Sequence, residues 1–129
     1  MKTSLLIDSY AWIEFFLGSS KGEQVRSFLD KGNCFTPLIV IAELAAKYAA
    51  FHSALWRERF QFIQEKTEIL NLTVEIASEA GRVRQKMRET RPRFGLADAI
   101  IYETARQHQM SVLSGDPHFQ GLPNATFLE

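Results

Sequence analysis

The most informative of the 15 acids in this 129-residue chain are Asp8, Glu43, Asp98 and Asp116, because each follows an apolar strand-like run or lies on an apolar helix face. A carboxylate buried without a partner costs several kcal/mol, so such a residue needs a cation, a metal ion or hydrogen bonds. Four converging carboxylates would repel one another unless cations lay between them. Mg²⁺ or Mn²⁺ suits an all-carboxylate site, whereas zinc favours His or Cys ligands. Such a site supports metal-assisted hydrolysis of a phosphodiester.

Asp8 and Asp116 each come after a predicted strand. Asp8 directly follows the apolar run at residues 3–7, and Asp116 follows the run at 112–113 through a Ser-Gly pair. Because ligands bind at the carboxyl edge of open α/β sheets, both residues are expected at a ligand-binding edge. Two structural alternatives stay open: Asp8 could serve only as a helix N-cap, and Ser-Gly-Asp-Pro around Asp116 could be an ordinary turn.

Glu43 and Asp98 lie on apolar faces of predicted helices. Glu43 is surrounded by the apolar residues of IVIAELAAKYAA, and apolar residues also stand three, four and seven positions after Asp98. A buried ion pair or backbone hydrogen bond would explain Glu43 equally well, and Asp98 could simply cap its helix. Glu14 and Glu103 point away from Asp8 and Asp98 on their helices and are expected to face solvent.

Short β-rich runs alternate with longer helical patterns, which is typical of a parallel sheet covered by helices. The sequence predicts a three-layer α/β/α sandwich with a mostly parallel central sheet, formed by a single domain over residues 1–129. Thr36 is expected to cap a helix that begins at Pro37. Strands are expected at 3–7, 34–35, 68–72, 112–113 and 125–128, and helices at 9–17, 23–31, 37–50, 55–66, 73–90 and from about residue 95.

Composition excludes several classes of protein. Lys and Arg number 15, equal to Asp and Glu, so the zero net charge excludes a histone-like polycation. A hydrophobic fraction of 46% with 10 Phe excludes a disordered chain. The lone Cys34 cannot form an internal disulfide and is expected to pack in the core in a reducing compartment. Asp8 and Glu14 interrupt the apolar N-terminal stretch, so we expect a soluble cytoplasmic protein without a membrane span.

Four segments, LLIDSYAWIEFF, PLIVIAEL, FGLADAIIYETA and VLSGDPHF, resemble in order and spacing the acidic motifs of PIN-domain nucleases, and more specifically of VapC-type toxin ribonucleases. The resemblance covers almost the whole chain, although the second motif is weak alone. It implies RNA as substrate, a homodimer and inhibition by a small antitoxin. It also implies an acidic quartet that holds one or two Mg²⁺ or Mn²⁺ ions, at Asp8, Glu43, Asp98 and Asp116, with Ser9 and Ser114 in support. The family more often has Thr where this chain has Ser114.

The segment at residues 82–93 carries six basic residues and one acid, a local net charge of +5. The other 117 residues hold 9 bases and 14 acids, a net charge of −5, so the zero total is a cancellation. One interpretation is a solvated amphipathic helix. The other is a track for RNA phosphates, in which Arg91 and Arg93 lie closest to the motif of Asp98.

The acids predict a metal-dependent hydrolase of phosphodiesters, and the resemblance implies that it is an endoribonuclease that acts as the toxin of a toxin–antitoxin pair. Glu43 is either a further metal ligand or the group that orients and deprotonates the attacking water. His118 either contacts substrate or merely packs in the turn before Phe119. The competing functions are a PIN-type nuclease that matures RNA or cleaves DNA, and a non-catalytic PIN-fold binding module.

Overall fold

The strands are short and lie in one parallel sheet. The computed structural model describes residues 3–129, in which the sheet has the order β3-β2-β1-β4-β5 and every neighbouring pair is parallel. All carboxyl ends therefore lie at one edge, as the alternation of strands and helices predicts. The strands are β1 (Leu5–Ile7), β2 (Cys34–Pro37), β3 (Glu68–Leu70), β4 (Ser111–Ser114) and β5 (Ala125–Phe127).

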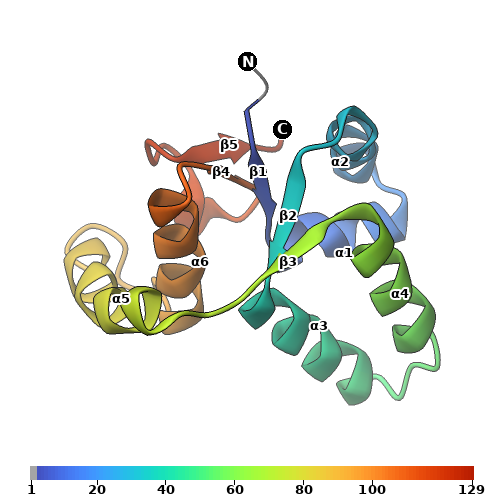
Figure 1. Ribbon diagram of the computed structural model, residues 1–129, viewed down its shortest axis with the longest axis horizontal. Coiled ribbons are helices and arrows are strands. Elements are labelled where there is room, and N and C mark those ends of the chain that lie inside the picture. The colour runs from blue at the N-terminus through green and yellow to red at the C-terminus, as the bar shows by residue number, and fades with distance from the viewer. Residues whose placement is uncertain (1–2) are drawn as a thin grey trace.

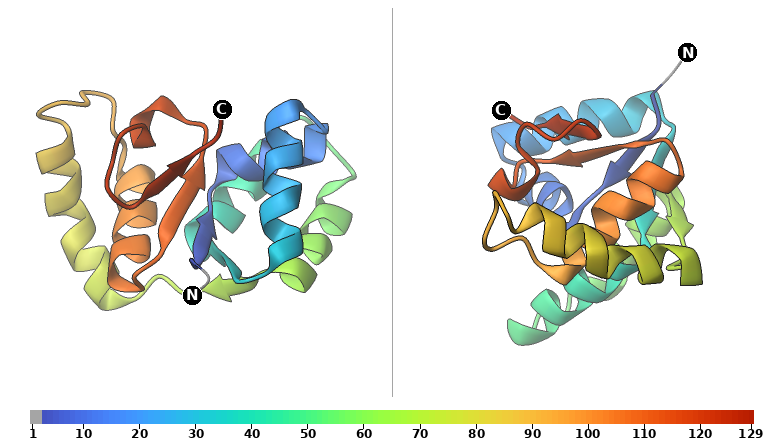
Figure 2. Two further views of the ribbon diagram at one scale, coloured as in Figure 1. Left: turned by 90° about the horizontal axis from the view of Figure 1, so that it is seen from above. Right: turned by 90° about the vertical axis from the view of Figure 1, so that its left-hand side faces the viewer.

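Six α-helices and one 3₁₀ turn surround this sheet in the described part of the chain, which confirms the predicted α/β/α architecture. Figure 1 shows α5 and α6 on one side of the sheet, α1, α2 and α4 on the other, and α3 beyond the carboxyl ends of the strands. The left view of Figure 2 shows the strands between these two groups of helices. The helices are α1 (Ser9–Leu17), α2 (Ser20–Lys31), α3 (Leu38–Ala50), α4 (Trp56–Lys66), α5 (Val74–Met87), α6 (Leu96–Gln107) and the 3₁₀ turn η1 (Pro117–Phe119).

The core forms where the central strands meet the apolar helix faces. Every residue of β1 is buried, as expected for a strand covered on both faces. Trp12 of α1 and Phe94 and Phe119 beside α6 are fully buried, and each large side chain contributes roughly 1.5–3 kcal/mol by burial. Cys34 is buried, as predicted. Within residues 3–129, no helix is long and apolar enough to cross a membrane.

Thr36 does not cap α3, so this prediction is wrong. It is a fully buried residue of β2, and Pro37 occupies the N-cap position without a side-chain hydrogen bond. The Thr36 hydroxyl accepts a hydrogen bond from Trp12 Nε1 at 3.2 Å and lies 2.7 Å from the Thr67 hydroxyl. The buried hydroxyl is thus satisfied by distant residues, which a local capping rule does not include. The parallel ladder also continues one residue further, because Pro37 pairs with Leu70 of β3.

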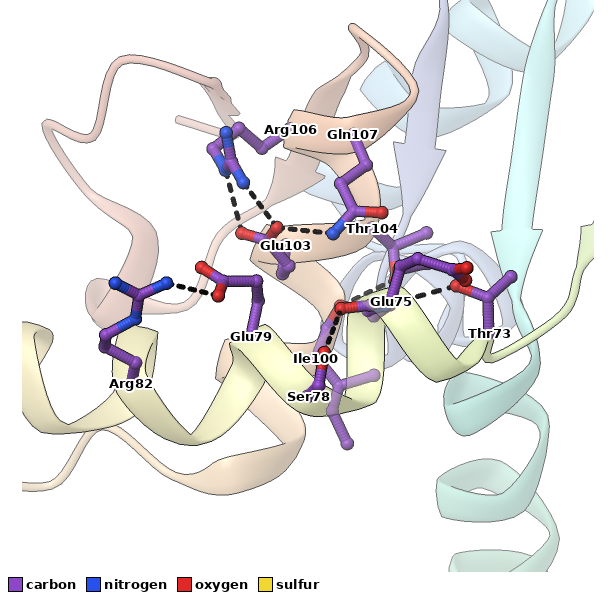
Figure 3. Close-up of polar contacts among 11 residues, drawn as sticks. Thr73, Glu75, Ser78, Glu79, Arg82, Ile100, Glu103, Thr104, Arg106 and Gln107 are labelled. Carbon is purple, nitrogen blue, oxygen red and sulfur yellow. Dashed lines mark hydrogen bonds and ion pairs between the residues drawn. The ribbon is translucent and has the colours of Figure 1, made fainter.

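Glu103 was expected to face solvent, and this prediction is wrong, because α5 and the sheet enclose α6 from two sides. Its side chain is fully buried and accepts two hydrogen bonds from Arg106, at 2.8 and 2.5 Å, and one from Gln107 at 2.6 Å (Figure 3). The Arg106 guanidinium holds the pKa of Glu103 below its usual value. Glu14 is half-buried and accepts a hydrogen bond from the Ser19 hydroxyl at 3.0 Å. Both acids therefore have structural partners of their own.

Candidate active site

Asp8 lies at the carboxyl end of the central strand. Its side chain caps α1 by accepting a hydrogen bond from the Ala11 amide at 2.8 Å, and the residue is only 3% exposed. Burial raises the pKa of Asp8 to about 7, against the hydrogen bonds from Ser114 and Ala11, and the nearby charges of Asp116 and Glu43 add to the increase. A carboxyl group with this pKa is poised to lose its proton when a cation binds.

Asp116 emerges from the neighbouring strand. Ile7 of β1 pairs with Leu113 of β4, so the ends of these two strands lie side by side. The buried hydroxyl of Ser114 accepts a hydrogen bond from the Asp116 amide at 2.9 Å, and Asp116 Oδ1 accepts one from the His118 amide at 2.9 Å. The expected turn is thus present, and it directs the Asp116 carboxylate toward the edge where Asp8 lies.

Asp98 lies in the first turn of α6. Its Oδ2 accepts a hydrogen bond from the Gly95 amide at 2.8 Å, and the same oxygen lies 3.0 Å from Nδ1 of His118. That nitrogen is also 3.7 Å from Asp116 Oδ1. One ligand atom from each of Asp98, Asp116 and His118 lies within 4.8 Å of the other two, which is close enough for all three to bind one ion.

Glu43 reaches this group from α3. The residue is half-buried, and its Oε1 is buried without a hydrogen-bond partner within residues 3–129. Burial raises the pKa of Glu43, the Ser9 hydroxyl opposes the increase, and the charges of Asp98 and Asp116 reinforce it. Neither the ion pair nor the backbone hydrogen bond that the sequence left open satisfies this oxygen. An unpaired buried carboxylate oxygen is costly, which makes this oxygen a candidate donor to a cation.

The structure therefore brings the four predicted acids together: the charges of Asp116 and Glu43 raise the pKa of Asp8, and the charges of Asp98 and Asp116 raise the pKa of Glu43. In the part of the chain that the structure describes, no lysine or arginine forms an ion pair with any of the four. The orphaned Oε1 of Glu43 and this donor set of oxygens fit a hard divalent cation. Ser114 hydrogen-bonds Asp8, and Ser9 hydrogen-bonds Glu43.

His118 joins the group more closely than the sequence indicated. Its position two residues after Asp116 was the available signal, because a short 3₁₀ turn returns the side chain toward the residue that caps it. The turn itself could not be read from Pro117 and His118 alone, and the contact with Asp98 depends on how α6 packs.

Basic residues border the same edge. Arg91 Nη2 donates a hydrogen bond to the Gln120 carbonyl at 2.6 Å, which holds the side chain across the mouth of the turn. Arg93 is exposed. A surface pocket of about 290 Å³ next to the acids is lined by Arg91, Pro92, Arg93, Pro117 and His118. His118 lines this pocket and also contacts Asp98, so the pocket lies directly beside the acidic group.

Comparison with known proteins assigns the family. The model of the PIN domain matches residues 5–124. The chain belongs to the PIN-domain family. No match was found among the curated proteins. The PIN domain described above is similar to a toxin–antitoxin complex from Klebsiella pneumoniae, with 22% identity, a TM-score of 0.77 and coverage of 98% of both chains.

Two further solved structures share the fold. The PIN domain is similar to VapC20 from Mycobacterium tuberculosis, a sarcin–ricin loop-cleaving toxin, with 11% identity, a TM-score of 0.77 and coverage of 98% of this chain and 100% of that one. It is also similar to DNA-bound VapBC from Salmonella typhimurium, with 17% identity, a TM-score of 0.71 and coverage of 98% and 97%. At these identities the similarity supports the fold.

Proposed function

We propose that this chain is a single cytoplasmic nuclease domain that cleaves RNA with Mg²⁺ or Mn²⁺ and acts as the toxin of a toxin–antitoxin pair. The observation that carries this proposal is the convergence of four carboxylates, one of which, Glu43, has a buried oxygen without a hydrogen-bond partner within residues 3–129. Membership of the PIN-domain family and similarity to a sarcin–ricin loop-cleaving toxin support the same conclusion.

In this proposal Asp8, Asp98 and Asp116 are the main metal ligands, and Glu43 completes the quartet. When bound, one or two divalent ions supply positive charge that lowers the pKa of an attacking water and neutralises the leaving oxygen. Glu43 either adds a fourth ligand through its Oε1 or, with its pKa raised by burial, accepts a hydrogen bond and then the proton from that water. Ser9 hydrogen-bonds this carboxylate.

The test of this function is incubation of the purified protein with structured RNA, unstructured RNA or DNA, each with Mg²⁺, Mn²⁺ or a chelator. We expect cleavage of RNA with either metal and none with the chelator, because the acids repel a phosphate unless cations lie between them. Cleavage of DNA alone would instead support a DNA-directed PIN nuclease. Tight RNA binding without cleavage under any condition would support the non-catalytic binding module.

The basic rim supports a nucleic acid as the substrate. Arg91 is fixed by the Gln120 carbonyl, and Arg93 lies exposed in the same pocket, so both are placed to contact phosphates that flank the scissile one. Such contacts position nucleic acid without reading its sequence. The acids and these arginines together provide a surface that holds the backbone of a single strand against the cation site.

Arg91→Gln and Arg93→Gln together are expected to weaken RNA binding and to reduce its salt dependence. Each lost phosphate contact should make the negative slope of log K against log salt shallower by about 0.7 for a single strand. Filter binding between 50 and 200 mM salt, in an Asp98→Asn background that leaves the RNA intact, measures both quantities. Arg57→Gln, on exposed α4 at the far side of the sheet, is the matched control. Unchanged affinity and slope in the double variant would remove both arginines from the site.

An antitoxin partner and a homodimer are also part of the proposal, since the similar structures include toxin–antitoxin complexes. A surface groove of about 580 Å³ between α1, α2 and α4 is lined by Phe15, Phe16, Phe62 and other residues, and the adjoining Leu17 is 71% exposed. Charged residues, among them Arg26, Arg59 and Glu65, line the rest of this groove, so it offers both apolar and charged contacts to a protein partner. The groove is separate from the carboxylates, so we propose that a segment of the antitoxin occupies it.

A further inference from the structure

The Nδ1 atom of His118 lies close enough to oxygens of Asp98 and Asp116 for all three atoms to bind one ion. At a metal–ligand distance of about 2.1 Å, adjacent octahedral ligand atoms lie about 3.0 Å apart and opposite ones about 4.2 Å. His118 Nδ1 lies 3.0 Å from Asp98 Oδ2 and 3.7 Å from Asp116 Oδ1. Both separations fall between these limits, so the ring nitrogen and the two carboxylates could bind the same cation with little movement.

The turn that carries His118 fixes the position of its ring. The His118 amide donates to Asp116 Oδ1, so the same aspartate that approaches the ring also caps the backbone below it. The ring lies 6.1 Å from the buried ring of Phe94, and the next residue, Phe119, is fully buried. The imidazole side chain is 32% exposed. It is therefore held against the acids on its inner side and open to solvent on the other.

We propose that His118 is a metal ligand that makes this site select transition-metal ions such as Mn²⁺ and Co²⁺ over Mg²⁺. The proposal rests on the metal-dependent function proposed above and specifies which ion that site prefers. Oxygen ligands alone suit Mg²⁺, whereas an imidazole nitrogen adds affinity for transition-metal ions in the order Mn²⁺ below Co²⁺. His118 therefore converts an all-oxygen site into one with mixed ligands.

The neutral imidazole ring has a tautomer that suits each of the two contacts. In the tautomer that donates to Asp98, the ring proton lies on Nδ1, because a carboxylate oxygen can only accept. Metal binding uses the lone pair of Nδ1, and the ring proton is then carried by Nε2 instead. The net charge of the ring stays the same, and no co-reactant is needed. Without metal, the hydrogen bond keeps the nitrogen aimed at the carboxylates.

Pulsed electron paramagnetic resonance of the Mn²⁺-loaded 129-residue chain tests the ligation directly. Coupling of the Mn²⁺ electron spin to a ¹⁴N nucleus is expected in the wild type and expected to disappear in His118→Gln, whose amide can still hydrogen-bond Asp98. His108→Gln is the matched control, because His108 is exposed at the end of α6 and should leave the coupling unchanged. A wild-type spectrum with bound Mn²⁺ but no nitrogen coupling would overturn the proposal.

Competition between metals tests the selectivity. The ratio of Mn²⁺ to Mg²⁺ affinity, measured by displacement of bound Mn²⁺ with Mg²⁺, is expected to fall by roughly tenfold or more in His118→Gln. An unchanged ratio would contradict a ligand role, even if the variant cleaved RNA more slowly through a lost substrate contact. A wild-type chain that bound no Mn²⁺ would overturn the metal-dependent function itself. Bound Mn²⁺ without nitrogen coupling would overturn only the role of His118.

Discussion

Asp8→Asn and Asp98→Asn are each expected to reduce metal-dependent RNA cleavage by on the order of 10³-fold while the chain stays folded. Each change removes one negative charge from the group that is proposed to hold the cation. The fold should survive, because an asparagine side chain still accepts the hydrogen bonds that these residues receive from the Ala11 and Gly95 amides. Loss of activity would therefore report on charge and ligation rather than on the helix caps.

Initial rates of cleavage with saturating Mn²⁺ measure this effect, and circular dichroism of the same samples checks the fold. Glu58→Gln is the matched control, since Glu58 is an exposed acid on α4 with no contact to the carboxylate group. It should cleave RNA at the wild-type rate. Wild-type rates from Asp8→Asn or Asp98→Asn would exclude the proposed mechanism, and unfolding of both variants would show that their structural roles dominate.

The capping roles of the three aspartates and their proposed roles in metal binding are compatible. Asp8, Asp98 and Asp116 each accept a backbone amide hydrogen bond at the start of a helix or 3₁₀ turn. Such a bond fixes the side-chain rotamer and leaves lone pairs on the carboxylate for a second contact. The structural interpretation and the functional one therefore describe the same hydrogen bonds, which hold the carboxylates in place before a cation arrives. Preorganisation of this kind is what an electrostatic site requires.

The layered fold could be predicted because its signals are local. Apolar runs such as LLI are short and bounded, and the helical patterns between them repeat often enough to define a parallel sheet. What could not be predicted depends on contacts between distant segments. Thr36 satisfies local capping rules, yet Trp12 and Thr67 bind its hydroxyl inside the sheet. Glu103 satisfies the rule for a solvent-facing residue, yet Arg106 and the packing of α5 over α6 make its burial tolerable.

The candidate site could be predicted to a similar extent. Strand ends and apolar helix faces predict that four acids lie near one edge of the sheet, because topology alone brings the ends of parallel strands together. The sequence could not show that Glu43 Oε1 lacks a partner within residues 3–129, because this depends on how distant donor groups are placed by the fold. The metal-ligand role that we propose for His118 could not be predicted from the sequence either. Its nitrogen meets Asp98, a residue 20 positions away, only after α6 has packed against the sheet.

The metal-free protein is expected to lose stability as the pH rises from about 4 to about 7, and Asp8→Asn is expected to remove most of that loss. Asp8 has a pKa of about 7 in the fold against a usual value of 3.8. Between these values the folded chain keeps a proton that the unfolded chain has released, so raising the pH favours unfolding. The difference corresponds to at most about 4 kcal/mol above pH 7, and to no penalty below pH 3.8. Asparagine carries no charge at any of these pH values.

Thermal unfolding with a chelator at pH 5 and pH 8 measures this effect. Asp8→Asn should raise the Tm at pH 8 by on the order of 5–10 °C and raise it less at pH 5. The variant should keep a weaker dependence of the same sign, because burial also raises the pKa of Glu43. Glu68→Gln, at an exposed position on β3, controls for the loss of one negative charge. A lower Tm for Asp8→Asn at pH 8 would contradict the assigned burial cost.

The same measurement with metal links this stability to the proposed function. A cation that binds only the folded chain raises the Tm, and the increase grows with the ratio of its concentration to its Kd. Millimolar Mn²⁺ should therefore raise the Tm of the wild type at pH 8 and have little effect on that of Asp8→Asn. The Tm of the wild type should then equal or exceed that of the variant, which is the more stable of the two without metal. The buried negative charge of Asp8 destabilises the fold without metal, and a bound cation removes this destabilisation by neutralising the charge. Equal stabilisation of both proteins by Mn²⁺ would show that the ion binds elsewhere.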